Sequence, residues 1–214
     1  MSQGLYSALS KTDLYDIGSH VNGHDAEAGH AVRSLPFDSR HEVHSVLSLG
    51  CGTGTFDAHA ARRFPNARIT SVDMNADMVG RLQGKAERHG WAKRLRTMIG
   101  DVRVKMAELK DERFDLIMAT GLLEYIPDPG EVIDPARELM ADNGLFLNSV
   151  VKPTLAGKFV GWVAQVRPST RDKNLEMFTS RGFDLDRIIE VPPAFSLAWI
   201  RMVKEAHVFK KKAA

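Results

Sequence analysis

The stretch "SLGCGTGTF", residues 48–56, most constrains the fold, because it places three glycines within five positions directly after an apolar run. Glycine in the interior of a helix or strand costs ~0.5–1 kcal/mol relative to alanine, and it is used where the backbone needs positive φ or a close approach. The preceding run "SVLSLG" predicts a short strand, and the following "TFDAHAARRF" predicts a helix with Phe56, Ala60 and Phe64 on one face. A glycine-rich turn between a strand and a helix indicates a place where a ligand meets the backbone.

Beyond residue 44, short apolar runs alternate with amphipathic stretches. The predicted elements alternate between strand and helix, beginning with a strand, over 45–50, 55–64, 67–73, 75–90, 94–101, 102–112, 114–121, 127–144 and 145–151. Strands separated by helices indicate a doubly wound α/β fold, in which a mostly parallel sheet lies between two layers of helices.

The two ends of the chain depart from this alternation. The last third is predicted as helices over 154–166 and 172–183, followed by strands over 184–191 and 197–211. Two strands without a helix between them can pair antiparallel. Residues 1–44 are polar and are predicted to form one or two helices ahead of the first strand. We therefore expect an N-terminal helical segment, acting as a cap or lid, over 1–44 and the α/β domain over 45–214.

Composition excludes several classes of function. Lys and Arg number 29 against 27 Asp and Glu, and a net charge of +2 is too small to indicate a nucleic-acid surface. The single cysteine, Cys51, allows no internal disulfide. No apolar run reaches the ~18 residues of a membrane span, and the N-terminus has no signal-peptide pattern. The expected location is the cytoplasm.

The spacing of acidic residues narrows the ligand. In open parallel sheets, ligands bind at the carboxyl ends of the strands. Asp73 ends the second predicted strand 73 − 54 = 19 residues after Gly54, where a carboxylate can accept hydrogen bonds from ribose hydroxyls. Thr55 stands where the dinucleotide pattern G-x-G-x-x-G has its last glycine. The loop therefore favours a nucleoside without a pyrophosphate, and it disfavours an NAD-dependent oxidoreductase.

Five segments then resemble, in order, the motifs of the class I S-adenosylmethionine-dependent methyltransferases. They are "VLSLGCGTG", "SVDMNADMV", "GDV", "FDLIMATGLLEYIPDP" and "ELMADNGLFLNSVV", within residues 46–151. The resemblance implies a Rossmann-like sheet of seven strands with a reversed last strand. It also implies S-adenosyl-L-methionine (SAM) as cofactor and S-adenosyl-L-homocysteine (SAH) as product.

The resemblance implies a cofactor-binding set. Its members are Gly50, Cys51, Gly52, Thr53, Gly54, Asp73, Met74, Asp101, Val102, Thr120 and Gly121. The glycines of the loop would line the methionine and ribose parts of the cofactor. Thr120 and Gly121 would border its methionine part. Asp73 would bind the ribose hydroxyls and Met74 would pack on the adenine. Asp101 would accept from the adenine amino group beside Val102.

Structural explanations compete with these roles. Gly50 could serve only a tight turn, Asp101 could only cap a helix, and Met74 could belong to the core. Cys51 is interpreted as a small filler of the loop rather than a nucleophile, because no base is placed for it.

Methyl transfer to a hydroxyl or ammonium requires a base for the departing proton. The candidates are Glu124 and Tyr125, after the fourth predicted strand, and His20 and His24 in the N-terminal segment. The alternatives are a contact with the cofactor for the first two and a surface position for the histidines. His20, His24 and His30 lack further ligands at suitable spacing, so no metal site is predicted.

The class of methyl acceptor is narrowed by two motifs that the sequence lacks. "ATGLLEY" stands where relatives that methylate nucleobase amino groups carry an Asn/Asp-Pro-Pro-aromatic motif, and no cysteine is placed for carbon-5 methylation. We expect methylation of O or N on a small-molecule acceptor by in-line SN2 displacement, with no nucleic acid as partner. The apolar 154–166 segment would lie over the pocket, with Trp162 as a wall. The alternatives are an RNA or protein methyltransferase and a non-catalytic partner subunit. A homodimer is compatible with the chain, although no pattern indicates one.

Overall fold

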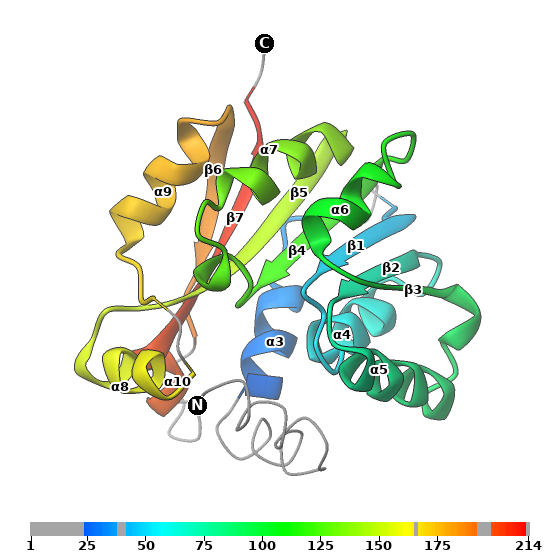
Figure 1. Ribbon diagram of the computed structural model, residues 1–214, viewed down its shortest axis with the longest axis horizontal. Coiled ribbons are helices and arrows are strands. Elements are labelled where there is room, and N and C mark those ends of the chain that lie inside the picture. Colours follow the sequence, from blue (N-terminus) through cyan, green and yellow to red (C-terminus); the bar gives the residue numbers. More distant parts are fainter. Residues whose placement is uncertain (1–23, 38–41, 165–166, 192–197, 213–214) are drawn as a thin grey trace.

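The computed structural model describes residues 24–37, 42–164, 167–191 and 198–212. Seven strands form one sheet in the order β3-β2-β1-β4-β5-β7-β6 (Figure 1). Their bounds are β1 Ser45–Leu49, β2 Arg68–Asp73, β3 Leu95–Ile99, β4 Phe114–Thr120, β5 Met140–Val151, β6 Phe183–Ile189 and β7 Lys204–Lys211. Neighbouring pairs from β3 to β5 are parallel, whereas β7 runs antiparallel to both β5 and β6. The predicted Rossmann-like α/β fold, with its reversed last strand, is confirmed.

Helices cover both faces of this sheet (Figure 1). Their bounds are α3 His24–Arg33, α4 Thr55–Arg63, α5 Ala76–Arg88, α6 Val102–Ala107, α7 Gly130–Leu139, α8 Leu155–Ala164, α9 Arg171–Thr179 and α10 Ala198–Val203, with short 3-10 helices at Ala92–Arg94 and Leu123–Tyr125. One apolar core joins α3, α4 and α5 to the sheet, and a second joins α6, α7 and α9 to its other face. The strands alternate between these cores: Val46 of β1 packs in the first and Leu47 in the second.

The described part of the N-terminal segment belongs to the first core. Ala28, Ala31 and Val32 of α3 are buried against β1 and α4. Residues 1–23 and 38–41 of the lid predicted over 1–44 lie outside the described residues, and His20 is among them. No helix in the described ranges is long and apolar enough to cross a membrane.

Two predicted helix ends are wrong, and at the first of them pairing in the sheet outweighs the local turn signal. The helix predicted over 127–144 ends at Leu139, and the strand begins at Met140, which pairs with Phe114 of β4. Asn143 and Gly144 therefore lie inside β5 rather than in a helix exit. The helix predicted over 102–112 is likewise shorter, since α6 ends at Ala107.

A third correction concerns the segment before β7. The strand predicted over 197–211 divides into α10 and β7, which begins at Lys204. "AWIRMV" is a short run of mostly apolar residues, and a run of that kind fits a helix as well as a strand by periodicity alone. The antiparallel pairing of the last two strands is confirmed, with Leu185 of β6 opposite Phe209 of β7.

Candidate active site

The residues singled out from sequence gather at one edge of the sheet. Parallel β1, β2, β3 and β4 end there, and these strands lead into Gly50, Asp73, Gly100 and Gly121. Because β7 is reversed, its first residue lies at the same edge, with Lys204 paired to Val151 at the end of β5. In Figure 1, β5, β7 and β6 form the left half of the sheet, so the end of β5, the start of β7 and the end of β6 lie beside the ends of β1 to β4.

Two kinds of glycine occur at this edge. Gly54 has φ +75°, and the Leu82 side chain fills the space that a Cβ would occupy, which a tight turn explains. Gly52 has φ +53° and Gly121 has φ +75°, and no described atom lies within 4 Å of where a Cβ would stand on either. Strain alone would account for glycine there, but the open space at both is also what a ligand approaching the backbone requires.

The amides of the glycine loop are largely used within the protein. Gly50 and Cys51 donate to the carbonyl oxygen of Val72 at 2.8 and 3.1 Å. Gly54 donates to the Cys51 carbonyl oxygen at 2.9 Å, and Gly52 donates to Oδ2 of Asp73 at 2.8 Å. In the described structure these four amides therefore donate to β2 and to the turn itself.

Asp73 is held in place and keeps acceptor capacity. Its Oδ2 accepts from Gly52 and its Oδ1 accepts from the amide of Asn75 at 2.9 Å. A carboxylate has about four lone-pair sites, so two remain for a ligand with paired hydroxyls. Met74 beside it is 75% exposed, which excludes the core-packing explanation for this side chain.

Asp101 has two roles in the described structure. It caps α6 by accepting from the amide of Arg103 at 2.9 Å, and it pairs with the Arg103 guanidinium, whose Nε lies 3.0 Å from Oδ1. These contacts lower the pKa of Asp101. Val102 next to it is buried in the second core. A ligand amino group at Asp101 would compete with Arg103, which the Glu131 carboxylate also holds at 2.7 Å.

Sequence reasoning missed Ile99. This residue pairs with Asp73 across β2 and β3, and it is 53% exposed. Together with Met74 it adds apolar surface beside the Asp73 carboxylate. The signal in the sequence was an apolar residue near the end of the strand predicted over 94–101, where a polar residue would cost less to expose.

Glu124 is the most unusual carboxylate of this edge. It follows β4 and is partly buried, and its Oε1 accepts from the amide of Val151 at 3.1 Å. Its Oε2 is buried without a hydrogen-bond partner in the described part of the chain. Burial raises its pKa, which the hydrogen bonds and Lys204 only partly oppose. Tyr125, the neighbouring candidate, is 46% exposed, and Thr120 is partly buried at the end of β4.

A buried charged cluster from α3, β5 and β7 lies near Glu124. Glu27 accepts from Oγ of Ser149 at 2.7 Å, and its Oε2 lies 3.0 Å from Nδ1 of His24 and 3.5 Å from Nζ of Lys204. His24, the histidine singled out from sequence, thus contacts a carboxylate instead of lying on the surface. Burial and the nearby Lys204 lower its pKa. No local pattern in the sequence indicates this cluster, because α3 and β7 come from opposite ends of the chain.

The cluster predicts a pH dependence of stability. Burial opposes ionisation of Glu27, but Lys204, His24 and Ser149 outweigh it and lower its pKa to about 2, against 4.5 ordinarily. Because the pKa of Glu27 is lower in the folded protein than in the unfolded chain, Glu27 stabilises the fold at pH values above its unfolded pKa. This stabilisation is lost as pH falls from about 4.5 towards 2. Urea unfolding across this range should show a shallower pH dependence for Glu27→Gln than for wild type. Glu87→Gln, on the exposed face of α5, is the control, and equal slopes for all three proteins would contradict the prediction.

Cys51 and Trp162 have simpler outcomes. Burial, and then the nearby carboxylates of Asp57 and Asp73, raise the pKa of the Cys51 thiol, so it is not a thiolate nucleophile. Trp162 of α8 is 77% exposed, and it does not line the cavity that the structure has between Lys152, Arg171 and Arg201, so its prediction as a wall is wrong for that cavity. Within the described ranges, no group of three or more His, Cys, Asp or Glu side chains could hold a metal ion.

The chain resembles several known methyltransferases in sequence. Residues 40–184 match the family described as "Methyltransferase domain". Malonyl-[acyl-carrier protein] O-methyltransferase of Halalkalibacterium halodurans is 26% identical over 117 residues, which is 54% of this chain and 42% of that protein. Ubiquinone biosynthesis O-methyltransferase of Actinobacillus pleuropneumoniae is 31% identical over 111 residues, 51% of this chain and 47% of that protein.

The fold has solved counterparts. Magnesium protoporphyrin IX methyltransferase from Synechocystis, with bound SAH, superposes with a TM-score of 0.68 at 17% identity, covering 89% of this chain and 84% of that one. The matches to the curated relatives span less than half of their length. The family match nevertheless covers about two thirds of the chain and includes the glycine loop, Asp73, Asp101 and Glu124. The chain belongs to the class I S-adenosylmethionine-dependent methyltransferase family.

Proposed function

We propose that this protein transfers a methyl group from SAM to an oxygen or nitrogen of a small-molecule acceptor. The observation that carries the proposal is Oε2 of Glu124, which is buried without a hydrogen-bond partner among the described residues, next to the edge where Gly52 and Gly121 leave open space. A buried carboxylate oxygen without a donor is costly, so a donor supplied by a ligand explains its retention.

The site fits a nucleoside cofactor at the ends of β1 to β4. Asp73 would bind the ribose hydroxyls with its remaining lone pairs, and Met74 with Ile99 would cover the adenine. The space beside Gly52 and Gly121 would take the methionine part. When bound, SAM supplies a methyl group already made electrophilic by its sulfonium.

Glu124 would receive the proton of the acceptor. Its Oε1 is held by the Val151 amide, which leaves Oε2 as the free oxygen. As the acceptor's oxygen or nitrogen bonded to the methyl carbon and the methyl–sulfur bond broke, the acceptor's proton would pass to Oε2, which would leave the methylated acceptor and SAH. Holding the two reactants in line can supply ~7–11 kcal/mol of the barrier. The raised pKa makes the Glu124 carboxylate a stronger base than an exposed one.

The names of the relatives support an oxygen or nitrogen acceptor. Two relatives are named as O-methyltransferases, and (S)-coclaurine N-methyltransferase of Papaver somniferum is 32% identical over 117 residues, 52% of this chain and 31% of that protein. These names concern those proteins, and they do not identify the acceptor of this one.

Calorimetric titration with SAM and with SAH tests the cofactor. We expect micromolar affinity for both, because typical KM values lie between about 1 μM and 1 mM. Mass spectrometry of a panel of small hydroxyl and amine compounds incubated with protein and SAM then tests transfer. Folded protein that binds neither SAM nor SAH would overturn the proposal. Binding of SAM with transfer only to RNA or protein substrates would replace the acceptor class.

A further inference from the structure

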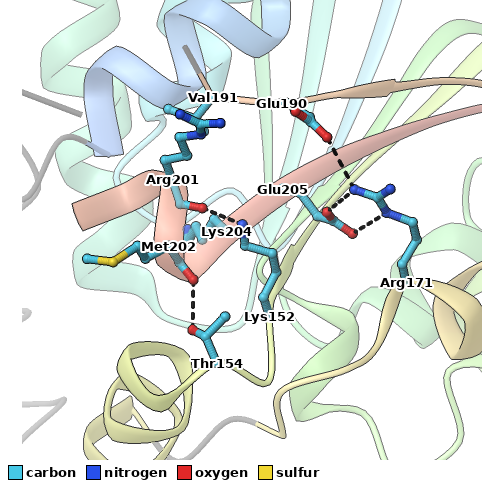
Figure 2. A pocket seen from close by; sticks show the side chains of 9 residues that line it. All are labelled: Lys152, Thr154, Arg171, Glu190, Val191, Arg201, Met202, Lys204 and Glu205. Atoms are coloured by element: carbon cyan, nitrogen blue, oxygen red, sulfur yellow. Dashed lines mark hydrogen bonds and ion pairs between the residues drawn. The ribbon is translucent and has the colours of Figure 1, made fainter. Parts of the chain in front are cut away.

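A charged cavity of about 540 Å³ opens at the half of the sheet edge that the proposed cofactor site does not use (Figure 2). Its walls come from the end of β5, the starts of α9 and β7, the segment after β6, and α10. Its size is within the ~300–1,000 Å³ of small-molecule sites. Lys152 in its wall follows Val151, whose amide holds Glu124. The cavity therefore begins one residue from the contact that positions the proposed base.

Cations outnumber anions in this wall. Its charged side chains are Lys152, Arg171, Arg201, Lys204, Glu190 and Glu205. Both carboxylates are committed to Arg171, whose Nη2 lies 2.8 Å from Glu205 and 3.5 Å from Glu190 (Figure 2). Lys204 is committed to Glu27 of α3 at 3.5 Å.

The Arg171–Glu205 pair is fixed from behind by a buried polar chain. His207 is fully buried, and its Nε2 lies 2.8 Å from Oε1 of Glu205. Its Nδ1 is in hydrogen-bond contact with Asn174, whose Oδ1 accepts from Asn148 at 2.9 Å. Because the side-chain amide of Asn174 donates to Nδ1 of His207, the ring proton of His207 is on Nε2, and Nε2 donates it to Glu205. The pair is thus a built part of the wall rather than a free ligand-binding group.

Lys152 and Arg201 remain as cations without a carboxylate partner in the described structure. Lys152 donates to the carbonyl oxygen of Arg201, which satisfies one donor and neutralises no charge. Thr154 holds the same helix by donating to the carbonyl oxygen of Met202 at 2.7 Å, as Figure 2 shows. The two contacts fix Lys152 and the Arg201 backbone on the same side of the cavity. Residues 192–197, "PPAFSL", contain no acidic side chain.

We propose that this cavity binds the acceptor through an anionic oxygen group, a carboxylate or a phosphate, held by Lys152 and Arg201. The inference rests on the proposed function, because it assumes that the molecule in the cavity is the one that meets Glu124. An acidic group on the acceptor would neutralise the surplus charge and would orient the reacting hydroxyl or amine towards β4. Neutral acceptors of the same shape would leave both cations unpaired and would bind more weakly.

Fluorine NMR titrations can test this without knowing the acceptor. The probes are 4-fluorobenzoate, 4-fluorophenyl phosphate and the neutral 4-fluorobenzamide, each added to the protein saturated with SAH. The variants are Lys152→Met and Arg201→Met, with Lys158→Met as the matched control, since Lys158 is exposed on α8 and does not line the cavity. SAH affinity is measured on every sample by calorimetry.

We expect each of the two anions to bind wild type and Lys158→Met with equal affinity. In Lys152→Met and in Arg201→Met the affinity for the anions should fall by about tenfold or more. The affinity for SAH should be the same in all four proteins. Whichever anion binds more tightly identifies the source as carboxylate or phosphate. Equal binding of the neutral amide, no binding of either anion, or anion binding indifferent to both cavity variants would overturn the inference. Failure of wild type to bind SAH would instead contradict the proposed function, so the two failures are distinguishable.

Discussion

Replacing Glu124 with glutamine should lower kcat by ~10²–10⁴-fold, the usual contribution of a positioned general base. Glutamine keeps the size of the side chain, and its amide oxygen can still accept from the Val151 amide. It cannot receive the acceptor's proton. Single-turnover assays with SAM in excess measure the chemical step directly, and SAH affinity should remain within about twofold of wild type.

The pH profile separates a base from a structural residue. Glu124 must be ionised to receive a proton, so kcat should fall as pH drops through its pKa, which burial places above the ordinary value for glutamate. This acid limb should disappear in Glu124→Gln. Glu138→Gln, whose side chain is 77% exposed, should keep both the rate and the limb. A loss of SAH affinity that matches the loss of rate would show that Glu124 holds the cofactor instead.

The positions of the proposed cofactor residues were predictable because these residues lie next to strand ends that the sequence reveals. A glycine loop after an apolar run and an acidic residue ending the next strand are both local signals, and parallel strands bring them together. The same reasoning placed Asp101 correctly at the start of a helix, but it could not show that Arg103 two residues later would hold the carboxylate.

The acceptor half was not predictable because its contacts join distant parts of the chain. The Glu27–Lys204 ion pair links α3 to β7, and the Arg171–Glu205 pair links α9 to β7. No spacing rule relates such positions. The error over α10 has a different origin, since the periodicity of a short apolar run does not distinguish a helix from a strand.

Replacing Asp73 with asparagine should weaken SAH binding by ~10²–10³-fold, because two charge-assisted hydrogen bonds to the ribose are lost or reduced. The same change also removes one of the two oxygens that can accept from the amide of Gly52. Part of the lost SAH affinity could therefore come from displacement of the glycine loop. Calorimetry with SAH and with its 2′-deoxy analogue forms a thermodynamic cycle that separates the two causes.

If Asp73 binds the ribose hydroxyls, wild type should prefer SAH over the 2′-deoxy analogue by about tenfold, and Asp73→Asn should show much less preference. A displaced loop would weaken both ligands equally and leave the preference intact, which would contradict the ribose contact. Asp77→Asn, an exposed change in the first turn of α5, should leave both affinities unchanged. The ratio of the affinities for SAH and its 2′-deoxy analogue, rather than the affinity for SAH alone, therefore decides between two roles of Asp73. Either its carboxylate binds the ribose hydroxyls, or it only supports the glycine turn.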